Sequence, residues 1–128
     1  MNAIKDHIAF QASALSLREK RNNMLASNIA NAGTPGYKAR DIDFDRELAR
    51  QVGDSPLRNK DDRHMDDVAG SSDADVQYRV PLNPSLDGNT VELSVEQMEF
   101  SENSLRYMTT LSFLNRRISG LMTAIRGE

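Results

Sequence analysis

Hydrophobic residues recur at helical spacing near both ends of the chain and lose that spacing in the middle. In residues 1–32, alternating steps of four and three residues trace a seam with apolar ends and a polar middle, formed by Gln11, Arg18 and Asn22. The apolar members of this seam are Ile4, Ile8, Leu15, Leu25 and Ile29. Such a repeat is typical of a helix that pairs with another along one face. It predicts an N-terminal helix that ends near Ala32.

The same repeat is stronger near the C-terminus, where seven of eight seam positions are apolar. These apolar members are Phe100, Tyr107, Leu111, Leu114, Ile118, Leu121 and Ile125. Ser94 and Gln97 have the spacing of a capping box, in which each side chain bonds the backbone of the other. We therefore expect a second long helix over residues 94–128 that pairs with the first as a coiled-coil-like hairpin.

Each predicted helix also carries a second apolar stripe. The residues of these stripes are Phe10, Ala14, Leu17 and Met24 in the first helix and Met98, Leu105, Met108 and Met122 in the second. A hairpin of two helices buries one seam per helix, so the second stripes favour packing against further chains. The alternative is that a short helix from the middle of the chain covers one of them.

Residues 33–93 form the irregular, polar middle of a single structural unit, because all four prolines and five of the seven glycines lie there. Gly33 stands where a left-handed helix cap is expected, and residues 34–36, Thr-Pro-Gly, are typical of a turn. Further on, residues spaced by four predict a short helix that starts near Asp43, and residues 77–80 favour an extended piece. Residues 53–75 contain seven aspartates and are expected to be flexible in the isolated chain.

The composition of the chain argues against several classes of function. The net charge of −3 over 128 residues is not that of a nucleic-acid-binding protein. With no tryptophan and 5% aromatic residues, a deep pocket for a small-molecule substrate is not expected. The absence of cysteine excludes disulfides, cysteine-bound zinc and a thiol nucleophile. Charges interrupt the apolar residues near the N-terminus, so no cleaved secretory signal is expected.

No motif for catalysis, a cofactor or a metal is present. Asp41, Asp43 and Asp45 imitate the start of a calcium loop, but Arg46 and Val52 stand where that loop needs glycine and glutamate. The sequence also lacks the glycine-rich nucleotide loops, the GxSxG nucleophile turn and the HExxH zinc motif. We therefore expect a non-enzymatic protein without catalytic, cofactor-binding or metal-binding residues.

Residues 27–38 read Ser-Asn-Ile-Ala-Asn-Ala-Gly-Thr-Pro-Gly-Tyr-Lys and resemble the N-terminal signature of bacterial flagellar rod and hook proteins. The signature residues are Ser27, Asn28, Ile29, Ala30, Asn31, Thr34, Pro35, Gly36 and Tyr37. Within that family, the chain is most similar to the short proximal rod proteins. Four further segments carry this similarity: residues 39–44, 78–81, 84–91 and 103–107.

The resemblance implies a structural subunit of the flagellar basal-body rod. Such proteins pass unfolded through the channel of the flagellar type III export apparatus, without cleavage. They assemble with copies of themselves and with other rod proteins, on the base of the basal body, into the hollow shaft that crosses the periplasm and transmits torque for motility. Their terminal helices form the inner tube.

Two questions stay open on the sequence alone. In a rod, Asn28, Asn31 and Tyr37 would hold the turn after the first helix against neighbouring subunits; the alternative is that these polar residues only cap the helix. The helical pattern also fits a small coiled-coil adaptor or export chaperone, which would form a closed dimer.

Overall fold

The computed structural model describes residues 2–53 and 75–127 of the chain. The elements follow in the order α1 (Asn2–Ala30), β1 (Arg40–Ile42), α2 (Phe44–Gly53), β2 (Val76–Tyr78) and α3 (Leu93–Arg126). The mainly α fold with two long terminal helices is therefore confirmed, as are the short helix after Asp43 and the extended piece near residue 77. Most of the stretch 53–75, for which flexibility is expected, lies outside the described residues.

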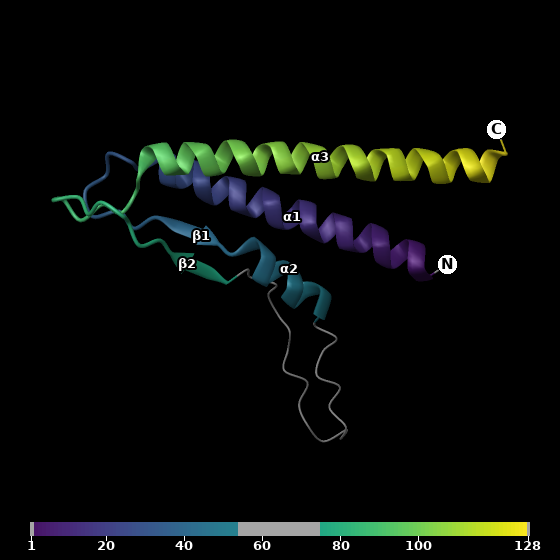
Figure 1. The fold of residues 1–128 in the computed structure, drawn as a ribbon, viewed down its shortest axis with the longest axis horizontal. Helices are drawn as coiled ribbons and strands as arrows, with labels where there is room; N and C mark the ends of the chain where they lie inside the picture. Colours follow the sequence, from purple (N-terminus) through teal and green to yellow (C-terminus); the bar gives the residue numbers. More distant parts are fainter. Residues whose placement is uncertain (1, 54–74, 128) are drawn as a thin grey trace, which may run out of the picture.

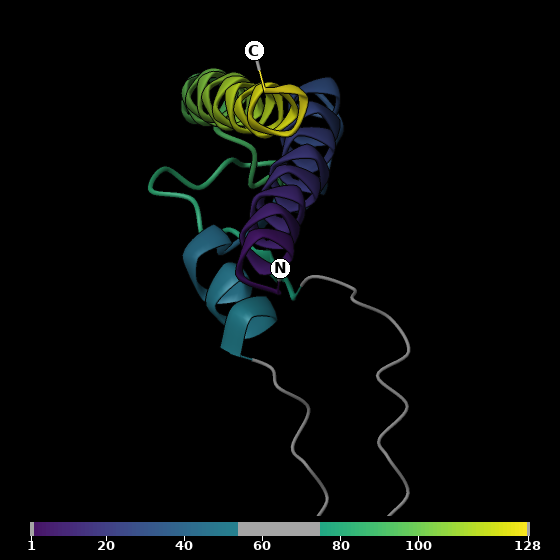
Figure 2. The ribbon, with the colours of Figure 1, turned by 90° about the vertical axis from the view of Figure 1, so that its right-hand side faces the viewer.

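The two long helices run antiparallel and form the main layer of the molecule (Figure 1). They lie against each other where α1 ends and α3 begins. From there they splay apart toward the two chain termini, which Figure 2 shows from the end. Among the described helices, none combines the length and the apolarity needed to cross a membrane.

A second layer formed by β1, β2 and α2 packs on α1 (Figure 2). The two strands pair antiparallel, with Ile42 opposite Val76. Leu17 of α1 and Ile42 form a small buried core, against which Met24, Phe44 and Leu48 pack. The short middle helix α2 thus covers part of the second apolar stripe of α1. For this stripe, the alternative to partner binding is therefore what the structure shows.

Two local expectations are wrong. The predicted capping box fails because α3 begins at Leu93, which puts Ser94 inside the first turn, and its N-cap residue Glu92 makes no side-chain cap bond. Gly33 is not left-handed either; among the glycines that the structure describes, those with positive φ are Gly36, Gly88 and Gly127. After α1, tight backbone bonds such as Ala32 N–H to the Ile29 carbonyl (3.2 Å) continue the chain without a left-handed residue.

The turn at residues 34–37 follows instead from Pro35 and Gly36. The Tyr37 N–H donates to the Thr34 carbonyl at 3.3 Å, which closes the turn. Gly36 has φ 72°, the left-handed value that a type II turn requires at its third position. This turn sends the chain back along α1 toward β1.

Candidate functional site

Asn28, the first asparagine of the signature, lies where three elements meet. Its side chain is 0% exposed. The amide nitrogen donates to the Arg40 carbonyl at 2.7 Å and to Oε2 of Glu96 at 3.0 Å, and the amide oxygen accepts the Arg40 N–H at 3.1 Å. One side chain therefore joins α1, β1 and α3, and both of its polar atoms are used within the chain.

Next to Asn28, five charged side chains form an ionic network between the helices and the strands. Arg21 of α1 donates to both carboxylate oxygens of Asp41, at 2.8 and 2.9 Å, and to Oε2 of Glu99 on α3 at 2.8 Å. Arg79, which follows β2, also pairs with Asp41, and its Nη1 lies 3.2 Å from Oε1 of Glu96. Because Glu96 is 0% exposed, its charge depends on these partners.

The network perturbs the ionisation of its central pair. The hydrogen bond from Arg21 to Asp41 raises the pKa of Arg21 above its ordinary value, against the effect of burial. Burial alone would raise the pKa of Asp41, but the hydrogen bond and the charge of Arg21 outweigh it, so the pKa of Asp41 is lowered. Both groups are therefore held in their charged forms.

A further polar contact between α1 and α3 lies one turn along. Asn103 of α3 is 1% exposed and donates to the Arg18 carbonyl and to Oδ1 of Asn22, each at 2.8 Å. The bonds of Asn28 with Glu96, Arg21 with Glu99 and Asn22 with Asn103 thus join α1 and α3 at three points, and we call these three contacts the polar ladder. A ladder of paired buried polar groups fits only one register of the two helices, because any slide leaves a rung unpaired.

The C-terminal end of α1 is capped from the other side of the chain by Asn89. This side chain is 5% exposed. Its Nδ2 lies 2.9–3.0 Å from the carbonyl oxygens of Asn31, Ala32 and Thr34, and its Oδ1 accepts the Val91 N–H at 2.8 Å. Asn89 therefore satisfies carbonyls that the end of a helix leaves free, and it ties the segment before α3 to the end of α1.

The other signature residues stay close to this turn. The Tyr37 hydroxyl lies 3.2 Å from the Ser27 hydroxyl, and Asn31 donates to the Ser27 carbonyl at 2.8 Å and accepts from the Thr34 hydroxyl at 3.1 Å. Ile29 is half-buried, and Ala30, Pro35 and Gly36 are exposed. Within one chain, the contacts of the signature residues thus hold together the end of α1 and the turn that leads to β1.

The predicted apolar seam is only partly covered within the chain. Leu25 is fully buried. The half-buried members are Ile8, Leu15, Ile29, Phe100, Tyr107, Leu114 and Leu121. The exposed members are Ile4, Leu111, Ile118 and Ile125. The exposed members lie near the N-terminus of α1 and from the middle of α3 onward, where the helices splay apart (Figure 1). Leu114 and Leu121, in the same part of α3, are half-buried.

Exposed apolar side chains gather on the C-terminal half of α3. We call this set the α3 stripe: Met108, Leu111, Ile118, Met122 and Ile125, with exposed fractions between 37% and 84%. A groove of about 500 Å³ runs beside it, lined by Met108 and Leu111 on one side and by Ser112, Asn115, Arg116 and Ser119. A contiguous exposed apolar surface of this kind marks a site of protein–protein interaction.

Sequence reasoning missed the residues of α3 and the loop that complete the buried polar contacts: Asn89, Glu96 and Asn103. Asn89 and Asn103 lie in segments that carried the family resemblance, but their partners are more than 50 residues away, so spacing did not reveal them. Glu96 lies near the start of a long helix, where an acidic residue favours the helix dipole, so its type and position alone do not predict that it is buried. In residues 2–53 and 75–127, no group of His, Cys, Asp and Glu could hold a metal ion.

Comparison with known proteins finds one family of relatives, both for the N-terminal region and for nearly the whole chain. The family model described as "Flagella basal body rod protein" matches residues 8–38. The flagellar basal body rod protein FlgB of Cereibacter sphaeroides (strain ATCC 17029) is 59% identical over 100% of both sequences. FlgB of Salmonella typhimurium is 44% identical, over 94% of this chain and 93% of the relative. FlgB of Escherichia coli K12 is also 44% identical, over 93% and 92%.

Proposed function

Because the chain belongs to the FlgB family of flagellar basal body rod proteins, it is a structural component of the basal-body rod, and we propose that it joins the rod through the α3 stripe. The family suggested by residues 27–38 is confirmed. The family is structural rather than enzymatic, and its members assemble with other rod components. The alternative of a separate adaptor or export chaperone is set aside, because relatives matched over nearly their whole length carry the rod name.

The observation that carries the proposal is the exposure of the α3 stripe in a chain whose family forms an assembly. Leu111 and Ile118 are 37% and 39% exposed, and Ile125 is 84% exposed. Burying one such side chain fully contributes about 1.5–3 kcal/mol. Several of them on one helix face therefore supply a driving force for docking another rod subunit along α3.

We further propose the finer features of the role that the family resemblance implies. The neighbours are copies of this chain and other rod proteins, near the base of the basal body, in the proximal part of the shaft that crosses the periplasm. The chain reaches that place through the type III export apparatus without cleavage of a signal. Once incorporated, it helps to transmit torque.

The test replaces one stripe residue by a charge and measures incorporation. We expect Ile118→Asp to leave the helix content of the purified chain unchanged but to remove the protein from isolated basal bodies, since burying an unpaired carboxylate is costly. Thr109→Asp is the matched control, because Thr109 is exposed and lies about 200° around α3 from Leu111 at ~100° per residue. Normal incorporation of Ile118→Asp would show that this stripe is not the interface.

A further inference from the structure

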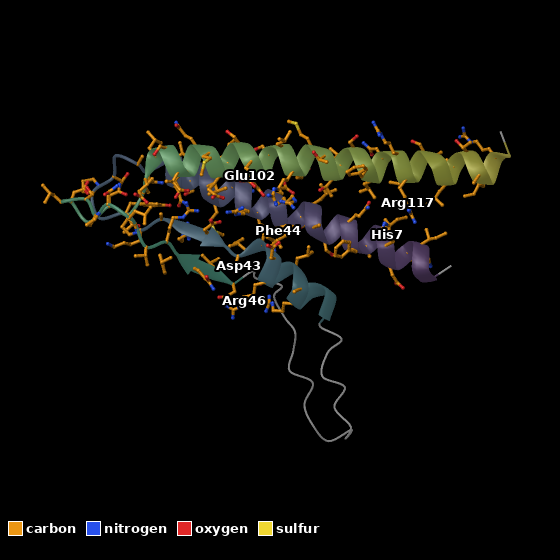
Figure 3. The ribbon with its side chains drawn as sticks, viewed as in Figure 1. His7, Asp43, Phe44, Arg46, Glu102 and Arg117 are labelled. Carbon is orange, nitrogen blue, oxygen red and sulfur yellow. The ribbon has the colours of Figure 1, made fainter. Side chains whose placement is uncertain are left out.

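A polar cleft of about 360 Å³ lies between α1, α3 and the layer of β1, β2 and α2. Its walls include Glu102 from α3 and Phe44 from the start of α2, both labelled in Figure 3. The cleft differs from the α3 stripe because its lining is mostly charged. Arg18, Arg21, Arg79 and Arg106 contribute four guanidinium groups to it.

Three of these four arginines already have a carboxylate partner. Arg21 and Arg79 share Asp41, and Arg106 pairs with Glu102 at 2.5 Å. Arg18 forms no ion pair within the described part of the chain; its guanidinium lies 3.9 Å from the centroid of the Phe44 ring. Arg18 is thus the cation of the cleft that remains without a counter-charge in contact.

The hydrogen bonds of Arg18 are also incomplete. Its Nη1 donates to Oδ1 of Asn103 at 3.4 Å, a long bond, and its Nε is buried with no acceptor. Burial, and then the charges of Arg106 and Arg21, lower the pKa of Arg18, and the charges of Asp45 and Glu102 offset only part of this effect. A desolvated guanidinium with a free donor and like charges nearby gains most from a carboxylate, which accepts charge-assisted and often paired hydrogen bonds.

We propose that this cleft receives an aspartate or glutamate side chain from an adjacent rod subunit and that Arg18 binds its carboxylate. The inference rests on the proposed function, because it needs a neighbour in the rod. Phe44 holds the guanidinium plane through its ring contact, so the fork of donors is oriented before the partner arrives. Asp43, Asp45 and Glu102 also line the cleft, and their negative charges repel an incoming carboxylate. The positive charges of Arg18 and Arg106 offset this repulsion.

The first test removes the charge but keeps the length of the side chain. We expect Arg18→Met to fold with normal helix content and to lower the amount of the protein in isolated basal bodies at least tenfold. Arg18→Lys should restore part of that loss, since it keeps the charge without the planar fork. Arg46→Met is the matched control, because Arg46 is exposed on α2 and does not line the cleft (Figure 3). Normal incorporation of Arg18→Met would overturn the inference.

The second test identifies the partner and does not depend on the stability of an Arg18 variant. A photo-crosslinking amino acid is placed at Tyr78, which lines the cleft and is 70% exposed. We expect crosslinks in assembled rods to a segment of another subunit that contains an aspartate or glutamate. Exchanging the charges, Arg18→Glu with that carboxylate changed to arginine, should restore incorporation.

The outcomes separate this inference from the proposed function. If rods contain the chain but Tyr78 crosslinks to no other subunit, the cleft holds only solvent ions and the inference is wrong. If the unmodified chain is absent from basal bodies, the proposed function is wrong as well.

Discussion

Asn28 and Arg40 bond each other twice: the Asn28 amide donates to the Arg40 carbonyl at 2.7 Å and accepts the Arg40 N–H at 3.1 Å. The side chain thereby acts as a strand partner for the backbone of β1. Its second amide hydrogen goes to the buried carboxylate of Glu96 at 3.0 Å. The asparagine of the signature therefore has a physical role within one chain, because no other neutral side chain of its size offers a donor pair and an acceptor in this geometry.

We predict that Asn28→Ala strongly destabilises the fold and that Asn31→Ala does not. The first change removes the side chain that bonds both peptide groups of Arg40, and it leaves the buried Glu96 with Arg79 alone. Each polar group left unsatisfied costs about 1–3 kcal/mol. The second removes bonds at the partly exposed turn and should cost at most about 1 kcal/mol. Urea unfolding followed by circular dichroism measures both. Equal, small losses would show that Asn28 is an ordinary capping residue.

Replacing Asn28 and Asn31 together tests whether these residues bind neighbouring subunits. If Asn28 and Asn31 act across an interface, the double alanine variant should be exported into the culture supernatant yet be missing from purified basal bodies while its isolated fold stays intact. From the contacts within the chain, we expect lower stability in the isolated protein instead. Measuring the fold and the incorporation of the same variant distinguishes the two.

The stability of the isolated chain should fall in acid because of Asp41. Its pKa is lowered in the folded chain, so the unfolded state, with an ordinary value of about 3.9, binds the proton more readily. The contribution of Asp41 is therefore present above about pH 4 and is lost as the pH falls through the folded pKa. Asp87, whose pKa is lowered by its hydrogen bond from Ser85, acts in the same direction.

Urea midpoints measured from neutral pH down to about pH 3 check this expectation, since this range spans the ordinary carboxyl pKa values. Asp41→Asn removes the ionisable group, so it should lower the stability at neutral pH and flatten the decline in acid. An Asp41→Asn variant with the same pH slope as the unmodified chain would assign the acid sensitivity to other carboxylates.

Glycine substitutions after α1 should separate the turn from the helix end. Gly36 has φ 72°, and an alanine in the left-handed region costs about 1–2 kcal/mol. A Cβ on Gly33 would meet no atom within 4 Å, and Gly33 has no left-handed φ. We therefore expect Gly36→Ala to lower the thermal midpoint and Gly33→Ala, or even Gly33→Val, to be tolerated. A larger loss of thermal midpoint for the Gly33 variants than for Gly36→Ala would show that Gly33 is the left-handed cap after all.

Periodicity was enough to predict both long helices, because their apolar repeat is a local property of each segment. It did not predict which face is covered. Phe100, Tyr107, Leu114 and Leu121 are half-buried, whereas Leu111, Ile118 and Ile125 from the same seam are exposed. At ~100° per residue, Leu114 and Leu121 lie on one side of α3, and Leu111, Ile118 and Ile125 are turned away from it by different amounts. Which side faces α1 depends on how the two helices cross, which a repeat on α3 alone does not reveal.

The polar ladder escaped sequence reasoning for a related reason. Glu96 and Asn103 are polar residues on an otherwise amphipathic helix, and such residues usually face solvent. Their burial is possible only because Arg79, Asn28 and Asn22 approach from distant parts of the chain. Some of these residues lie in the segments that carried the family resemblance. Their hydrogen bonds and ion pairs, however, form only when the fold brings distant segments together.

Leu114 lies between the part of α3 that packs on α1 and the exposed α3 stripe. It is half-buried in the single chain and lies between Leu111 and Ile118 of the α3 stripe along the helix. We expect further burial in the rod, so Leu114→Asp should abolish motility without lowering expression, because a buried unpaired carboxylate is costly. Swimming in soft agar and an immunoblot of whole cells are the measurements. Normal swimming would show that this part of α3 stays in contact with water.

The last prediction concerns Asn89, which joins the end of α1 to the start of α3. Its amide nitrogen lies within 3.0 Å of three carbonyl oxygens after α1, and its oxygen holds the Val91 N–H. Asn89→Ala removes these hydrogen bonds, so we expect a loss of about 2–4 kcal/mol, at a net contribution of roughly 0.5–1.5 kcal/mol for each bond. Asn89→Asp should also be poorly tolerated, because a carboxylate repels the carbonyl oxygens where the amide donates.

Asn83→Ala is the matched control for this change. Asn83 is exposed in the same loop, and its backbone N–H, which the substitution keeps, is the group that bonds Glu92 at 3.3 Å. Urea unfolding should therefore place Asn83→Ala close to the unmodified chain and Asn89→Ala well below it. Hydrogen exchange of the backbone amides should locate the difference, with faster exchange in the last turn of α1 and in residues 87–91 of the Asn89 variant. Uniform loss of protection, or none, would mean that the end of α1 is held by the turn at Gly36 rather than by Asn89.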